Sequence, residues 1–219
     1  MNKKKVILIN LLVFIFYFIY TITPALIIYF FNIKFSNNLQ KEIYYISTGI
    51  IYMLIMILIY KKELLFDIKN IKIKNFIKYI PIYLIGIILM GLSNALVYKI
   101  TNMQVSENES LVRQYIKLYP IYMSFSTVIF SPFIEEIIFR KSIRNVINNK
   151  YLYITISGII FGLIHTNSFN TNDLLNSIPY IVMGIDFAYI YYKSDNIFTT
   201  ITFHSMHNLI LLIIQFIGG

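Results

Sequence analysis

The chain contains no cysteine, and charged residues are scarce. Its 219 residues include no Cys and only 13% Asp, Glu, Lys and Arg, whereas 58% are hydrophobic. Without cysteine there is no disulfide framework, no Cys-based metal site and no thiol nucleophile, so any catalysis must come from Glu, Asp, His, Ser or Tyr. A soluble domain of this size carries about a quarter charged residues. The composition therefore predicts an integral membrane protein.

Acidic residues are fewer than basic residues, and the formal net charge is +9. The basic residues are not gathered into one soluble patch but lie in short breaks between apolar runs. Membrane proteins keep their cytoplasmic lysines in such breaks. We therefore expect membrane lipid around the chain and no nucleic acid partner.

Long apolar runs make up most of the rest of the sequence. Runs of about 17 to 25 residues can cross a bilayer as helices, and no internal repeat or low-complexity linker separates them. The sequence thus predicts an all-α polytopic membrane protein with about seven spans. They are Val6–Phe31, Ile43–Tyr60, Phe76–Lys99, Tyr119–Arg140, Tyr151–Thr166, Ile178–Tyr192 and Ile197–Ile217.

The positions of the 19 Lys and Arg residues predict the orientation. If the N-terminus lies inside, fourteen of them fall on the cytoplasmic side and five on the outer side. Such a bias favours an N-terminus in the cytoplasm, and we expect the protein in the cell membrane. Residues 61–75, KKELLFDIKNIKIKN, alternate lysines with apolar residues and are predicted to lie along the inner membrane surface.

Ionisable residues inside the predicted spans are confined to the C-terminal half. Each costs about 2.5 to 3.5 kcal/mol at mid-membrane even on lenient scales, so such residues are functional by default. The set consists of Glu135, Glu136, His165, Asp186, His204 and His207, with Asn208 as a neutral polar companion and Arg140 at the edge.

Hairpin geometry indicates that these residues can meet. If two helices turn near Lys150, Glu135 lies 15 residues before the turn and His165 lies 15 after it. Both then sit roughly 22 Å above the turn. His204 lies nine residues beyond Asp195, at the next predicted turn, or roughly 14 Å along its helix. The spacing permits one shared site inside the membrane.

Spacing within each helix separates the roles. Glu136 and Arg140 are i and i+4 and can pair along one face, which leaves Glu135, about 100° around the helix, free to face something else. His204 and Asn208 share another face. A buried Glu near His can act as general base towards water, and His with Asn can hold a metal or an oxyanion. The pattern favours hydrolysis.

Three motifs in this region resemble those of a known family. They are EEIIFR from Glu135 to Arg140, FGLIH from Phe161 to His165 and HSMHN from His204 to Asn208. In this order they resemble the CPBP intramembrane protease family, also called Abi, which includes the type II CAAX prenyl endopeptidases and bacteriocin-associated relatives. Pro132, three residues before the paired glutamates, also fits. The resemblance implies a catalytic domain over residues 119–214, whereas residues 1–118 are N-terminal transmembrane helices without a specific signal.

The resemblance implies a role for each motif residue. Glu135 would activate the hydrolytic water, with His165, His204 and Asn208 completing the catalytic group. Glu136 and Arg140 would orient that group through their pairing. Whether Zn²⁺ is bound stays open, since Glu135, His165 and His204 suit either a metal site or a Glu and His mechanism.

Four further residues lie close to the motifs. Asp186 departs from the family pattern, and we expect it to orient His204 across the last hairpin. His207 is expected to pack or face outward, and Phe161 to pack around the site. The small pair Gly184 and Ala188 is expected to permit close helix approach.

The resemblance implies an endopeptidase acting on a membrane-associated peptide or protein near the membrane boundary. Candidate substrates are bacteriocin or signalling-peptide precursors and prenylated CAAX tails. Two other readings stay open: a non-proteolytic membrane scaffold or bacteriocin-immunity protein with the same fold, and an ion-coupled transporter. The transporter is less attractive because no inverted repeat is evident.

Overall fold

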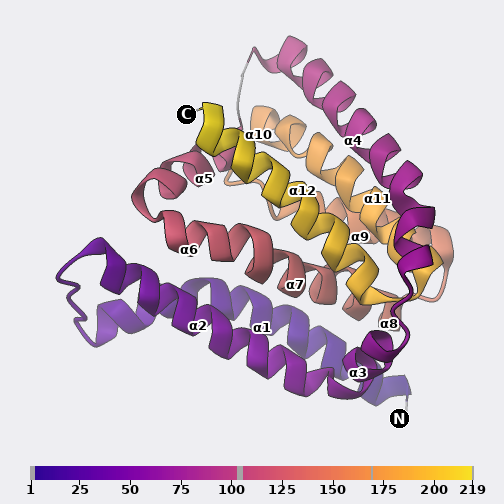
Figure 1. Cartoon of the computed structure of the whole chain (residues 1–219), viewed down its shortest axis with the longest axis horizontal. Helices are drawn as coiled ribbons and strands as arrows, with labels where there is room; N and C mark the ends of the chain where they lie inside the picture. The colour runs from indigo at the N-terminus through magenta and orange to yellow at the C-terminus, as the bar shows by residue number, and fades with distance from the viewer. Residues whose placement is uncertain (1–2, 103–105, 169, 219) are drawn as a thin grey trace.

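The structure, a computed structural model, describes residues 3–102, 106–168 and 170–218. Every regular element within these ranges is a helix (Figure 1). In chain order they are α1 (Lys3–Phe30), α2 (Asn38–Ile59), α3 (Lys61–Lys69), α4 (Ile73–Thr101), α5 (Glu107–Leu118), α6 (Pro120–Phe125), the π-helix η1 (Ser126–Phe130), α7 (Ser131–Glu136), the π-helix η2 (Ile137–Ser142), α8 (Ile143–Val146), α9 (Lys150–Leu163), α10 (Thr171–Asn176), α11 (Ile178–Ser194) and α12 (Ile197–Gly218). The predicted all-α fold is confirmed.

Six of the predicted spans are helices long and apolar enough to cross a membrane. Among the described residues these are Lys3–Phe30, Asn38–Ile59, Phe76–Thr101, Pro120–Val146, Thr171–Ser194 and Ile197–Gly218. The remaining prediction, Tyr151–Thr166, corresponds to α9, which has only 14 residues. At 1.5 Å per residue α9 measures about 21 Å, less than the roughly 30 Å hydrocarbon core. Helix α9 alone is therefore too short to span the hydrocarbon core.

The helix that carries the paired glutamates is longer than its predicted span. It runs from Pro120 to Val146 through the two π-helices and ends where Ile147 adopts an extended conformation. The helix therefore continues beyond Arg140 into the polar stretch that follows, as the predicted turn near Lys150 requires. This continuation sets Glu135 ten or more residues from either end of the helix.

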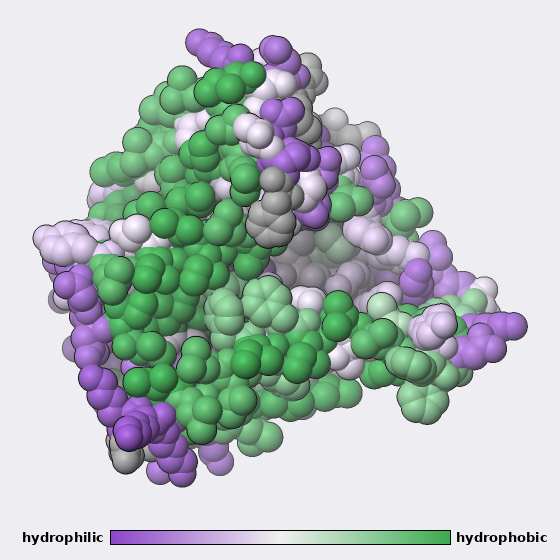
Figure 2. All heavy atoms as spheres, turned by 180° about the vertical axis from the view of Figure 1, so that it is seen from behind, coloured by the Kyte–Doolittle hydropathy of each residue, from purple (hydrophilic) through white to green (hydrophobic). Residues whose placement is uncertain are grey.

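The helices differ strongly in how much protein surrounds them. The buried share of the most apolar 18 residues is only 11% in Lys3–Phe30 but 56% in Thr171–Ser194. In Figure 1 the pair α1 and α2 lies on one side of the molecule and α4 on the other, with α7, α9, α11 and α12 between them. Figure 2 shows a broad hydrophobic face with hydrophilic residues gathered along one edge and at the corners. The C-terminal helices form the interior, and the outer helices present apolar surface to lipid.

Helices α9 and α11 pack with almost no side chain between them. A Cβ added at Gly158 would lie 2.9 Å from the backbone nitrogen of Ile185, and one at Gly162 would lie 2.7 Å from that of Ile181. On α11, Gly184 faces the Gly158 carbonyl oxygen. Because glycine alone fits at this distance, the backbone before His165 is held directly against α11.

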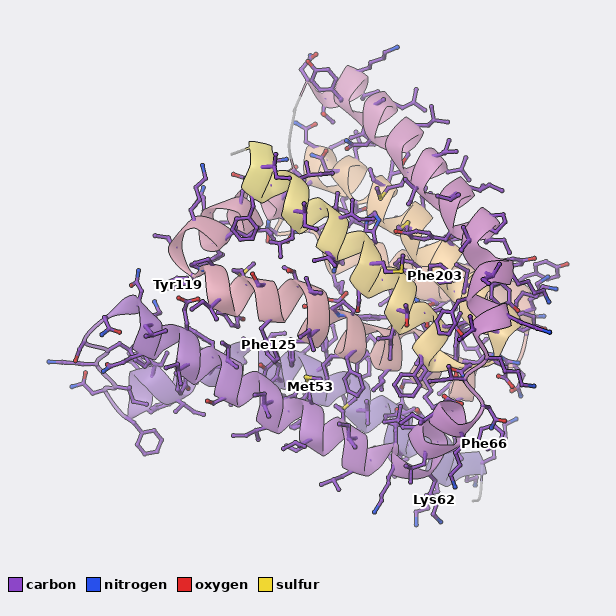
Figure 3. The ribbon with its side chains drawn as sticks, in the orientation of Figure 1. Met53, Lys62, Phe66, Tyr119, Phe125 and Phe203 are labelled. Atoms are coloured by element: carbon purple, nitrogen blue, oxygen red, sulfur yellow. The ribbon has the colours of Figure 1, made fainter. Side chains whose placement is uncertain are left out.

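The short helix α3 is fastened to the C-terminal half. The Asp67 carboxylate lies 2.8 Å from Lys141 Nζ, and both side chains are buried. The Asp67 carbonyl also accepts a hydrogen bond from Asn196, just before α12. Figure 3 shows Lys62 and Phe66 of α3 near the N-terminal end of the chain and Tyr119 at the opposite end of the molecule. One surface helix thus contacts the helix that carries the first motif and the start of the helix that carries the third.

Candidate active site

Two π-helices frame the paired glutamates. Elements η1 and η2 stand immediately before and after the six-residue α7, which ends at Glu136. A π-helix widens the helix by one residue per turn and rotates the side chains that follow it, and such segments occur frequently at functional sites. The local widening sets the direction in which Glu135 and Glu136 leave the helix.

The pair of Glu136 and Arg140 is present and has no exposed side-chain surface. Arg140 Nε lies 3.2 Å from Glu136 Oε2, although the two groups are not aligned for a hydrogen bond. Arg140 Nη1 donates to Ser157 Oγ on α9 at 3.2 Å. The guanidinium also lies over the Phe161 ring, 4.4 Å from its centroid. Arg140 therefore joins the first motif to the helix that carries the second.

His204 lies between the two carboxylates. Its Nδ1 is 3.0 Å from Glu136 Oε1, and its Nε2 is 3.9 Å from Glu135 Oε2. The ring stacks on Phe187 with centroids 5.0 Å apart and meets Phe161 edge-on. Since a carboxylate can only accept, Nδ1 carries the proton, and in the neutral ring Nε2 presents its lone pair on the side of Glu135.

The two glutamates differ in access. Side-chain exposure is 12% for Glu135 and 0% for Glu136. A water molecule can therefore reach Glu135, whereas Glu136 is sealed between Arg140 and His204. Of these two glutamates, only Glu135 has side-chain surface that another molecule can contact.

His165 approaches the same region from the end of α9. It lies two residues beyond Leu163, in a turn rather than inside a span. Its Nδ1 is 2.8 Å from the Phe161 carbonyl oxygen, so Nδ1 donates and Nε2 stays free. The ring stacks on Tyr180 at 4.4 Å and lies 4.9 Å from Phe161. Because Phe161 touches Arg140, His165 and His204, it brings all three motifs together.

Asn208 faces η1. Its Nδ2 donates to the backbone carbonyl of Thr127 at 2.8 Å. His207 is buried and contacts the Tyr83 ring of α4 edge-on, which is a packing role. The second N–H of the Asn208 amide is not used by this bond.

The prediction that Asp186 orients His204 is wrong. The carboxylate on His204 Nδ1 belongs to Glu136. Asp186 instead faces α4, where a Cβ added at Gly86 would lie 2.6 Å from its Oδ2, and that oxygen is buried without a hydrogen-bond partner among the described groups. Helix α11 packs on α9 with one face and on α4 with another, and Asp186 lies on the second.

The family description "Type II CAAX prenyl endopeptidase Rce1-like" matches residues 117–210. Those residues are similar to an Rce1-like domain and are called the Rce1-like domain below. The segment contains all three motifs, whereas Tyr83, which contacts His207, lies outside it. The resemblance seen in the sequence is confirmed over these residues, and the chain is a membrane protein.

Two relatives extend the comparison of the Rce1-like domain. Over 188 residues the chain is 27% identical to a candidate membrane peptidase, YdiL, of Bacillus subtilis (strain 168), which covers 84% of this chain and 74% of that protein. Over 98 residues it is 30% identical to an uncharacterized protein of Mycoplasma capricolum, covering 44% of this chain and 28% of that protein. No solved structure matches the chain.

The donor set of the Rce1-like domain does not fit a three-ligand zinc centre in this arrangement. Among the residues that the structure describes, no three His, Asp or Glu side chains converge closely enough to hold a metal ion. Glu135 and His204 come within 3.9 Å of each other and would supply two ligands, since the bond from His204 Nδ1 to Glu136 leaves Nε2 available. A catalytic zinc site has three protein ligands, and the described residues bring no third one to this pair.

Three residues that help to build this site have no role predicted from the sequence. Ser157 receives Arg140, Tyr180 stacks on His165, and Phe187 stacks on His204. Ser157 carried a usable signal, because it is a polar residue in an apolar helix, four residues before Phe161 and eight before His165. The two aromatic residues carried none in a chain with 18 Phe and 19 Tyr.

Proposed function

We propose that the Rce1-like domain is an intramembrane endopeptidase that hydrolyses a peptide bond in a membrane-associated peptide or protein. The observation that supports it most is the position of His204, which is bonded to Glu136 through Nδ1 and has Nε2 3.9 Å from the partly exposed Glu135. That gap is too long for a direct hydrogen bond. It suits a water molecule held between a carboxylate and an imidazole.

In the proposed reaction Glu135 is the general base. It accepts a proton from the water, and the water oxygen bonds to the carbonyl carbon of the scissile peptide. The C–N bond then breaks as the same proton passes to the leaving nitrogen. The second N–H of Asn208 donates to the oxyanion of the tetrahedral intermediate, while Glu136 and Arg140 keep His204 in one tautomer and orientation.

The histidines hold the water and the substrate. Both have Nδ1 occupied by an acceptor, which leaves each Nε2 free to accept a hydrogen bond. A free Nε2 can bind the second proton of the water or an N–H of the substrate backbone. The aromatic residues around them exclude bulk water, which strengthens these contacts.

We further propose that the end of the molecule with α3 and the N-terminus faces the cytoplasm of the cell membrane. Support comes from the basic residues of α1, α3, α8 and the start of α9, because these segments share that end in Figure 1. An excess of Lys and Arg is typical of the cytoplasmic side of a membrane protein. The proposed substrates are bacterial precursor peptides that lie on or in the membrane. A scaffold or immunity function would need none of the chemistry of Glu135.

The test compares the wild-type protein with Glu135→Gln in proteoliposomes carrying a library of membrane-associated peptides, with products identified by mass spectrometry. Glu109→Gln is the matched control, since the Glu109 side chain is 39% exposed and forms an ion pair with Arg113. The proposal predicts product peptides from the wild type and the control and none from Glu135→Gln. Equal products from all three proteins, or none from any, would favour the non-proteolytic reading.

A further inference from the structure

The carbonyl of Thr127 has no helical hydrogen-bond donor available. In η1 the N–H of Ser131 bonds the Ser126 carbonyl, five residues back. Continuing this pattern, the donor for Thr127 would be residue 132. That residue is Pro132, which has no N–H. The widened turn and the proline together leave one backbone acceptor unpaired inside the protein.

Asn208 of α12 supplies a hydrogen-bond donor to this carbonyl. Its Nδ2 donates to the Thr127 carbonyl at 2.8 Å, across two helices that are 81 residues apart in sequence. An unpaired backbone carbonyl in a membrane interior costs several kcal/mol. The bond therefore satisfies Thr127 and at the same time fixes the amide plane of Asn208, and with it the direction of the second N–H.

We propose that Pro132 is a positioning residue: by denying Thr127 a helical partner it keeps that carbonyl open for Asn208 and so aims the remaining Asn208 N–H at the reacting carbonyl. The inference rests on the proposed function for its catalytic consequence. The contact itself does not, and this separates the two in an experiment.

The first arm measures cleavage by Pro132→Ala. Alanine supplies the missing N–H, which competes with Asn208 for the Thr127 carbonyl. We expect kcat to fall about tenfold, the effect of one lost hydrogen bond in the transition state, with KM unchanged. In the Asn208→Ala background the same change has no further effect on kcat. Equal fold-losses in both backgrounds would overturn the inference.

The second arm separates the N–H from the proline ring. Replacing Pro132 with lactic acid by nonsense suppression gives the alanine side chain without a backbone N–H. This variant is expected to retain activity within about twofold of the wild type, because the donor that competes with Asn208 is absent. The control Pro81→Ala, at an exposed site within α4, should behave likewise. Loss of activity in the lactic acid variant would assign the effect to the ring.

The third arm uses unfolding in mixed micelles and needs no cleavage. Asn208→Ala leaves the Thr127 carbonyl unpaired and lowers the unfolding midpoint. Adding Pro132→Ala to it supplies a new donor and should raise the midpoint again. If the second change lowers the midpoint further, the inference fails. Absence of cleavage by the wild type would sink the proposed function and leave this unfolding result to decide the contact.

Discussion

Changing Glu135 to glutamine and changing the neighbouring Glu136 to glutamine should have different effects on stability and on cleavage. Glu136 is fully buried and holds both Arg140 and His204. Removing its charge takes away the carboxylate that forms an ion pair with the Arg140 guanidinium, which is also fully buried. Removing one partner of a buried pair costs about 3 to 5 kcal/mol. Glu136→Gln should therefore lose that much stability.

Glu135→Gln should leave stability almost unchanged. The side chain of Glu135 is partly exposed, and the His204 ring that faces it lies 3.9 Å away through Nε2. Such a loose pair contributes less than about 1 kcal/mol. Cleavage, in contrast, should fall by about 10² to 10⁴, the usual contribution of a general base. Glu136→Gln should also reduce cleavage, because a glutamine at this position can reverse the tautomer of His204.

The assay is SDS titration of the purified variants in mixed micelles, read by circular dichroism, alongside cleavage in proteoliposomes. Glu109→Gln is the control for loss of a glutamate on an exposed surface, with an expected change below about 0.5 kcal/mol. The reasoning is refuted if Glu135→Gln is destabilised as much as Glu136→Gln. It is equally refuted if Glu136→Gln unfolds at the wild-type midpoint.

Two further predictions concern the helix before His165 and the metal. Gly162→Ala should reduce stability by about 1 to 3 kcal/mol and also reduce cleavage, because the added Cβ meets the Ile181 backbone nitrogen at 2.7 Å and displaces α9. The matched control is Gly91→Ala, which has open space around it and should not reduce stability. Unchanged stability of Gly162→Ala would contradict the packing. Treatment with phenanthroline followed by desalting should leave cleavage unchanged, since no third ligand stands beside Glu135 and His204 among the described residues; loss of activity that Zn²⁺ restores would show that a metal site assembles.

The spans and the meeting of the motifs could be predicted because both follow from length and spacing. Apolar runs long enough to cross a bilayer became the long helices, and the equal distance of Glu135 and His165 from Lys150 brought both to the region of Phe161. The i and i+4 spacing of Glu136 and Arg140 likewise predicted their pairing. Each of these needs only helix geometry.

The end of α9 could not be predicted from its apolar run. The run continues past Leu163, but the helix stops there because the backbone then turns towards α10. Asp173 accepts hydrogen bonds from the N–H groups of Asn167 and Ser168 and holds that turn. Such a local hydrogen-bond pattern in the loop has no signature in hydrophobic periodicity.

The direction of Asp186 and the π-helices also escaped prediction. Helix α11 has neighbours on more than one side, so spacing alone does not tell whether Asp186 faces His204 or Gly86. The two π-helices, within residues 126–142, change the directions in which side chains leave the helix, and the amino-acid composition does not reveal them. Pro132 follows the first π-helix, but the sequence alone does not show that the Thr127 carbonyl accepts its hydrogen bond from Asn208.

The most direct test of the central claim is a single turnover of an identified substrate in H₂¹⁸O, with the product and the peptide containing Glu135 analysed by mass spectrometry. If Glu135 activates water for direct attack, the new carboxyl group of the product gains one ¹⁸O atom and Glu135 gains none. An ¹⁸O atom in Glu135 with an unlabelled product would show attack by the carboxylate itself and would contradict the account.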